Sequence, residues 1–116
     1  MDILTRINFG YDGLIREIHI FNKRIEFEIS AYDNVINNWI NVRFFAEDIS
    51  EYKVIQPLFI SNEVISDAIL IRKMDGAIWF SLSPYSEIID NIDDLRKSNI
   101  YCICKNIHWK ILPYKE

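Results

Sequence analysis

Two cysteines and a histidine lie within seven residues near the end of the sequence, at Cys102, Cys104 and His108. Thiolate and imidazole groups bind zinc when their sulfur and nitrogen atoms converge to about 2.0–2.3 Å from the metal. In an extended strand the two cysteines share a face about 6.6 Å apart, and His108 lies about 13 Å further along. A reversal at Lys105–Asn106 would instead place His108 opposite Ile103, on the face away from the cysteines. Both geometries separate the imidazole from the thiols, so we expect no metal and interpret the cysteines as small core residues.

The other histidine, His19, is the remaining candidate for acid–base catalysis. Glu17 stands two residues earlier, so in an extended strand it shares a face with His19 and could orient the imidazole as a general base. The sequence carries no Gly-x-Ser-x-Gly turn to present a nucleophile, and its three glycines are isolated, unlike those of phosphate-binding loops. We interpret His19 as a partly exposed strand residue, in phase with Ile15 and Phe21. We therefore expect no catalytic residue and no cofactor, and an enzyme is disfavoured.

Acidic and aromatic side chains form the third group of candidates. In a helix, Asp93 and Asp94 would follow Asp90 at the i+3 and i+4 positions and share its exposed face. The simplest interpretation is a solvated helix face, and the alternative is an acidic patch that steers the encounter with a basic partner. Aromatic anchors beside such acids would supply affinity. The candidate partner-binding residues are Glu47, Asp48, Glu51, Tyr52, Tyr85, Asp90, Asp93 and Asp94.

The spacing of apolar residues predicts that β-strands position most of these candidates. Residues 24–32 alternate between an apolar face and a charged or polar face, which is typical of a half-buried antiparallel strand. The Asp75-Gly76 dipeptide between two apolar runs favours a tight hairpin turn. Strands are predicted over 13–21, 24–32 and 38–46, around 52–56, on both sides of Asp75-Gly76 from about Val64 to Pro84, and in a closing strand or hairpin over 100–114.

One segment, Ser86–Ser98, predicts a helix. Ser86 can cap its N-terminus, and Arg96 and Lys97 near its end complement the helix dipole. Apolar residues between Ile88 and Leu95 follow the i, i+1, i+4, i+7 pattern of a single stripe. Because the segment is short, we expect it to be stable only when it packs against the sheet.

Length and composition limit the architecture. The chain has 116 residues, of which 50% are hydrophobic and 14% aromatic, and isoleucine is the most frequent residue. This length suits a single globular domain over 1–116 with one core, and β-branched and aromatic side chains favour strands. The expected fold class is α+β, mainly β: a curved antiparallel sheet or sandwich-like half-barrel of about six to eight strands, with one helix near residues 86–97.

The charge balance limits the partners. Thirteen Lys and Arg residues are scattered among 17 Asp and Glu residues, giving a net charge of −4, whereas nucleic-acid binders usually carry a basic patch. No apolar run approaches the roughly 20 residues of a membrane span, and the first residues do not resemble a signal peptide. We expect a cytoplasmic protein that binds neither nucleic acid nor a membrane directly, with both thiols reduced.

The strand order and spacing over the first 84 residues resemble those of a known group of bacterial proteins. The segments that carry the likeness are FGYDGLIREIHI, RIEFEISA, NWINVRFFAEDISEY and VISDAILIRKMDGAIWFSLSP. Together they resemble small, mainly β immunity proteins of bacterial polymorphic-toxin and contact-dependent growth-inhibition systems. The resemblance implies a cytoplasmic inhibitor that binds one cognate toxin domain, often a nuclease, and blocks its active site. Nuclease sites are basic because they bind phosphates, so acids on the inhibitor would suit them.

A small-ligand-binding or other non-catalytic β domain is the alternative. A ligand binder would need a cavity inside the curved sheet, lined by residues such as Phe27, Phe44 and Trp79.

Overall fold

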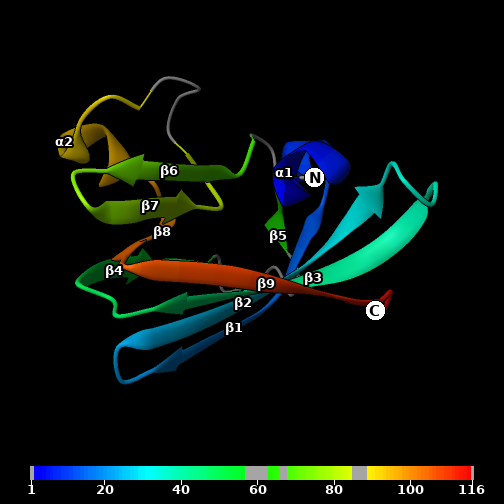
Figure 1. The fold of residues 1–116 in the computed structure, drawn as a ribbon, viewed down its shortest axis with the longest axis horizontal. Helices are drawn as coiled ribbons and strands as arrows, with labels where there is room; N and C mark the ends of the chain where they lie inside the picture. Colours follow the sequence, from blue (N-terminus) through cyan, green and yellow to red (C-terminus); the bar gives the residue numbers. More distant parts are fainter. Residues whose placement is uncertain (1, 57–62, 66–67, 85–88, 116) are drawn as a thin grey trace.

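The computed structural model describes residues 2–56, 63–65, 68–84 and 89–115, which form two antiparallel β-sheets packed face to face (Figure 1). The first sheet contains, in spatial order, β5 (Glu63–Val64), β1 (Leu14–Phe21), β2 (Arg24–Asp33), β3 (Asn38–Glu47) and β9 (Asn106–Pro113). The second sheet contains β4 (Glu51–Val54), β8 (Ile100–Cys104), β7 (Ala77–Ser81) and β6 (Leu70–Met74). Short helical segments are α1 (Ile3–Arg6), the 3₁₀ turn η1 (Asn8–Gly10) and α2 (Ile92–Leu95). Each sheet has four main strands, since β5 adds only two residues, and the predicted mainly β, sandwich-like fold is confirmed.

The main core lies between the two sheets. Phe80 of the second sheet contacts Phe27 and Phe44 of the first, with ring centroids 4.9 and 5.3 Å from its own, and all three rings are fully buried. Trp79 is the neighbour of Phe80 in β7, so it points to the opposite side of the second sheet and belongs to another cluster. Phe27 and Phe44 therefore do not share a cavity with Trp79, as the alternative of a small-ligand binder would require.

The hairpin turn predicted at Asp75-Gly76 is present. Asp75 and Gly76 have φ values of 51° and 80°, and residues with positive φ at both central positions are typical of the type I′ turn. Lys23 also has a positive φ, 60°, in the turn between β1 and β2. The edge strand expected near residues 52–56 is β4, at one edge of the second sheet. From the sequence, an irregular segment is also expected from Pro57 onward, and it lies mostly outside the described residues.

A β-bulge in β1 changes which of its side chains face the core, compared with the prediction from strict alternation. The register against β2 shifts between Ile15 and Glu17. Ile15 is consequently buried in the core, whereas Glu17 and His19 lie on the solvent face. The prediction that Ile15 shares a face with His19 is wrong, because strict alternation cannot anticipate the extra residue of a bulge.

The reversal at Lys105–Asn106, one of the two geometries considered from the sequence, does not form a hairpin within the second sheet. β8 lies between β4 and β7, so both of its edges are already paired. The chain therefore leaves the second sheet at Lys105, and β9 pairs with β3 at the edge of the first sheet. His108 lies opposite Phe45, not Ile103.

The helix is shorter than predicted. α2 begins after Asn91, whose side chain accepts a hydrogen bond from the backbone N–H of Asp94 (2.9 Å). The expected cap, Ser86, lies outside the described residues, and Asp90 precedes the helix, so the predicted shared helical face with Asp93 and Asp94 is not formed. Near α2, a second buried cluster on the outer side of the second sheet contains Trp79, Ile89, Leu95, Tyr101 and Ile103. No helix in the described ranges is long and apolar enough to cross a membrane.

Candidate functional site

An acidic depression lies at the end of the second sheet where α2 approaches the β6–β7 turn. Three acids line it, Glu51, Asp75 and Asp90, and none of the described residues that line it is Lys or Arg. Its other lining residues are mostly apolar or aromatic: Met74, Ala77, Trp79, Ile92 and Ile103, with Ser50 and Asn91. We call this set of ten residues the acidic depression. An apolar floor rimmed by carboxylates suits a basic side chain that carries an apolar stem.

Three segments far apart in the sequence supply the acids. Glu51 is the first residue of β4 and pairs with Ile103 of β8. Asp75 occupies the β6–β7 turn, and Asp90 precedes the capping residue of α2. The acids meet because β8 pairs with both β4 and β7, which brings the start of β4 to the same end as the β6–β7 turn.

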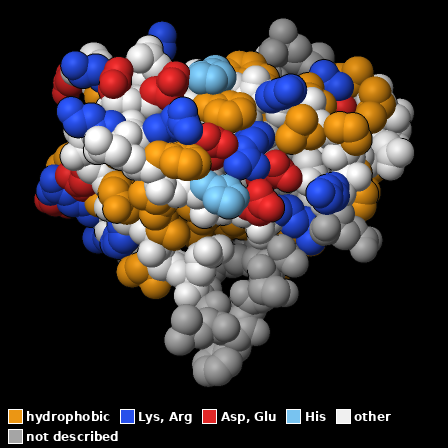
Figure 2. Space-filling model, turned by 90° about the horizontal axis from the view of Figure 1, so that it is seen from below, with side chains coloured by type: hydrophobic (Ala, Val, Ile, Leu, Met, Phe, Trp, Pro, Cys, Tyr) orange, Lys and Arg blue, Asp and Glu red, His pale blue; other side chains and the backbone are white. Residues whose placement is uncertain are grey.

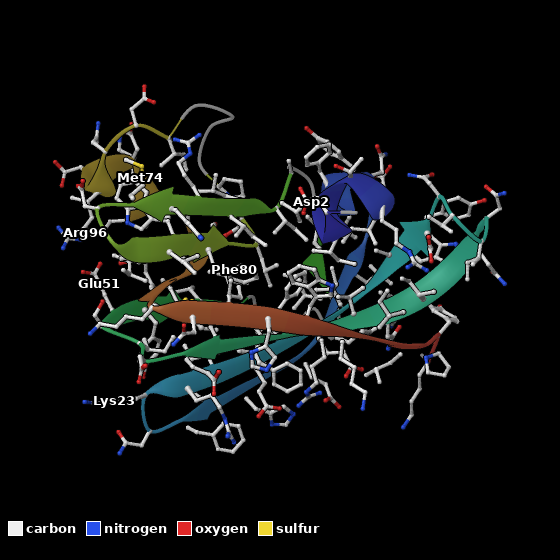
Figure 3. All side chains as sticks on the ribbon, viewed as in Figure 1. Asp2, Lys23, Glu51, Met74, Phe80 and Arg96 are labelled. Carbon is white, nitrogen blue, oxygen red and sulfur yellow. The ribbon has the colours of Figure 1, made fainter. Side chains whose placement is uncertain are left out.

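Glu51 is held rigidly by two partners. Arg96 donates hydrogen bonds from Nε and Nη2 to the two carboxylate oxygens, both at 2.8 Å, and the Tyr101 hydroxyl donates at 2.6 Å. Figure 3 shows Glu51 and Arg96 at the same end of the molecule. The hydrogen bonds from Arg96 and then Tyr101 lower the pKa of Glu51 to about 2. Burial, followed by the hydrogen bond to Glu51, raises the pKa of Tyr101 to about 12. Glu51 is therefore a fixed anion at neutral pH.

We expect Glu51→Gln to destabilise the protein by about 1 kcal/mol at neutral pH, after allowance for the partial exposure of the ion pair. The pKa of Glu51 falls from 4.5 to about 2 on folding, so its contribution is present above pH 4.5 and is lost as the pH falls toward 2. Urea unfolding of both proteins between neutral pH and about pH 2.5 measures this. The gap between the two proteins should narrow on acidification; a gap independent of pH would contradict the assignment.

The other predicted partner-binding residues that the structure describes do not line the acidic depression. Asp93 is highly exposed and 4.0 Å from Arg96, so it shares a cation with Glu51. Asp94 pairs with Lys97 at 3.6 Å. Glu47, Asp48 and Tyr52 do not line the acidic depression, and Tyr85 lies outside the described residues. Of the predicted residues that the structure describes, Glu51 and Asp90 are the two that line the acidic depression.

Sequence reasoning missed Asp75 and the apolar floor. Asp75 was interpreted only as a turn residue, although a turn also exposes its carboxylate to solvent. Ile92 and Ile103 gave no functional signal, because apolar residues in strands and helices usually indicate core, and Trp79 was considered only as the lining of an internal ligand cavity.

The solvent face of the first sheet carries an ion-pair network, and Figure 2 views the molecule from this side. Arg43 contacts Glu26, Glu28 and Glu17 at 2.9, 2.8 and 3.2 Å. The predicted contact between His19 and Glu17 is present, at 3.2 Å between Nε2 and Oε2. Hydrogen bonds from His19 and then Arg43 lower the pKa of Glu17. Because Glu17 is shared with Arg43 and both members of the pair are half-exposed, this contact has the character of a surface ion pair.

The cysteines and His108 are separated in space. Cys102 and Cys104 are buried between the sheets, where a hydrogen bond with Cys104 and then burial raise the pKa of Cys102. His108 lies on the solvent face of the first sheet and stacks on Phe45, with ring centroids 4.9 Å apart. Within the part of the chain that the structure describes, no three His, Cys, Asp or Glu residues are grouped to hold a metal ion.

These observations describe a surface suited to binding a basic group. Comparison of the chain with protein-family models, with curated proteins and with solved structures found no match.

Proposed function

We propose that this protein is a cytoplasmic immunity protein that binds a cognate toxin domain, of nuclease type, and neutralises it by protein–protein contact. The observation that carries the proposal is the acidic depression: three carboxylates around an apolar floor, with no Lys or Arg among its described lining residues. The active site of a nuclease is basic because it binds phosphates, so a surface of this kind is complementary to it. The protein acts as an inhibitor and not as an enzyme.

The acids differ in the role that they have in this proposal. Glu51 is neutralised by Arg96 and fixes the geometry of the rim. Asp90 is 76% exposed and lies 4.0 Å from Arg72, at the limit of an ion pair, so its charge remains available to a partner. Asp75 is exposed at the turn. Trp79 and Ile92 provide the apolar contact area beneath these two carboxylates.

The variant Asp75→Asn/Asp90→Asn tests the proposal without disturbing the turn, since Asn-Gly suits a type I′ turn as well as Asp-Gly does. The partner in this experiment is a candidate nuclease toxin domain that co-purifies with the wild-type protein. At low salt we expect the association rate to fall about tenfold, with the difference shrinking as salt rises, because charge complementarity acts mainly on the encounter. Stopped-flow or surface binding kinetics measure the rate.

A matched control removes two acids from elsewhere. Asp12 and Glu17 are exposed and do not line the acidic depression. The variant Asp12→Asn/Glu17→Gln changes the net charge by the same amount and should retain the association rate. Equal rates for both variants would exclude the acidic depression as the interface, and no inhibition of the toxin by the wild-type protein would exclude the function itself.

A further inference from the structure

β9 forms one edge of the first sheet. It is eight residues long, and β3 pairs with it from Glu47–Asn106 to Ile40–Pro113. Among the described strands, none pairs with its other edge, and Figure 1 shows β9 in front of the other strands. A long free edge presents a row of backbone N–H and C=O groups that can template another strand.

The inner face of β9 extends beyond the cover of the second sheet. Trp109 and Ile111 lie opposite Phe44 and Val42, which are fully buried, so all four side chains point to the same side of the first sheet. Nevertheless Trp109 is 41% exposed and Ile111 is 37% exposed. Ile107 and Trp109 border a groove whose other wall is formed by β6 and β7, so the apolar layer at the free edge is only partly covered. Another strand with apolar side chains on this face would extend it.

We propose that β9 pairs antiparallel with β9 of a second copy of this chain, about a two-fold axis at Trp109. Such pairing keeps the inner faces of both strands on the same side of the joined sheet. With Trp109 at the axis, the two tryptophans are adjacent and Ile107 of each copy lies opposite Ile111 of the other. On the solvent face His108 lies opposite Lys110. Aromatic and β-branched cross-strand pairs of this kind stabilise a sheet.

Other symmetric registers fit less well. Centring the pair on Lys110 places two ammonium groups opposite each other, which is destabilising. Centring it on His108 shortens the paired segment and sets Lys105 opposite Ile111. The pattern of β9 is therefore self-complementary in one register, and this favours a second copy over an unrelated strand. No residue of β9 lines the acidic depression, although Asp75 and Ala77 of that depression also line the groove beside Ile107 and Trp109.

Sedimentation velocity over a concentration series tests the proposal. The wild-type protein should shift from monomer to dimer, and Trp109→Arg should weaken the dimer more than about tenfold, because two guanidinium groups would meet at the axis. Trp39→Arg is the matched control: Trp39 has a similar exposure, 37%, but lies on the solvent face of the interior strand β3. A wild-type protein that stays monomeric at every concentration would overturn the proposal, as would a Trp109→Arg variant that dimerises normally.

Cross-linking tests the register. In Trp109→Cys the two introduced thiols lie at the axis and should form an intermolecular disulfide on mild oxidation, whereas the native cysteines are buried. Lys110→Cys should cross-link poorly. The opposite order would reject the register centred on Trp109, and circular dichroism of each variant confirms that it is folded.

Discussion

Replacing Phe80 with Ala is expected to lower the free energy of unfolding by about 3–5 kcal/mol, the usual range for removing a buried aromatic ring. Phe80 is fully buried and is the residue of the second sheet whose ring contacts both Phe27 and Phe44 of the first. Its removal deletes two aromatic contacts and leaves a cavity between sheets whose backbone positions are fixed by strand pairing. Collapse around the cavity is therefore limited. Urea unfolding monitored by circular dichroism measures the change.

Phe21→Ala is the matched control for this variant. Phe21 lies at the end of β1 with its ring half-exposed, and its contact is with the Arg24 guanidinium, 4.5 Å from the ring centroid. Its loss should change the unfolding free energy by less than about 1 kcal/mol. If Phe80→Ala changed stability no more than Phe21→Ala does, the two sheets would not depend on this aromatic contact.

Arg6→Ala is expected to have the second largest effect. The Asp33 carboxylate has no solvent exposure and is held by Arg6, with Nε at 2.9 and 3.0 Å from its two oxygens and Nη2 at 2.6 Å. Asp33 also accepts a hydrogen bond from the backbone N–H of Val35 at 2.8 Å. Without Arg6 the buried Asp33 carboxylate loses its counter-ion, and leaving a buried charge unpaired costs about 3 kcal/mol or more.

The pH dependence of this effect distinguishes a lost charge partner from a lost packing contact. In the wild-type protein the hydrogen bond from Arg6 lowers the pKa of Asp33, so the stabilisation is present at neutral pH and is lost as the pH falls below the ordinary value of 3.8. In Arg6→Ala the unpaired carboxylate gains a proton more readily. The difference in unfolding free energy between the two proteins should therefore shrink in acid. A difference that stays constant from neutral pH to about pH 3 would show that Arg6 acts through packing alone.

Local sequence patterns predicted the structure correctly where a strand pairs with the next strand along the chain. The alternation over residues 24–32 predicted which side of β2 is buried, and the structure buries Ile25, Phe27, Ile29 and Ala31. The Asp75-Gly76 turn was equally local, since two residues with positive φ decide it. The bulge in β1 was not predictable, because one extra residue between Ile15 and Glu17 is specified by the fit against β2 and not by the pattern of β1 alone.

The residues of the acidic depression could be predicted only in part, because the depression depends on pairing between strands that are distant in the sequence. Glu51 and Asp90 were recognised as acids with a possible function, but nothing in the sequence places them beside Asp75. Their proximity depends on β8 lying between β4 and β7, a non-local pairing. The exposed carboxylate of Asp75 was overlooked because no local pattern shows that the β6–β7 turn lies beside the start of β4.

By itself, the sequence determined the period-two strands, the tight turns, the burial of the cysteines and the mainly β class, because each follows from side-chain chemistry within a few residues. Tertiary structure alone decided which sheet each strand joined. Lys105 shows the physical reason: β8 has neighbours on both edges, so the next strand had to cross to the first sheet. That crossing placed His108 far from the thiols and left β9 as a free edge. Hydrogen-bonding capacity at the edge of a strand is a property of the assembled sheet, and no local pattern encodes whether it is already used.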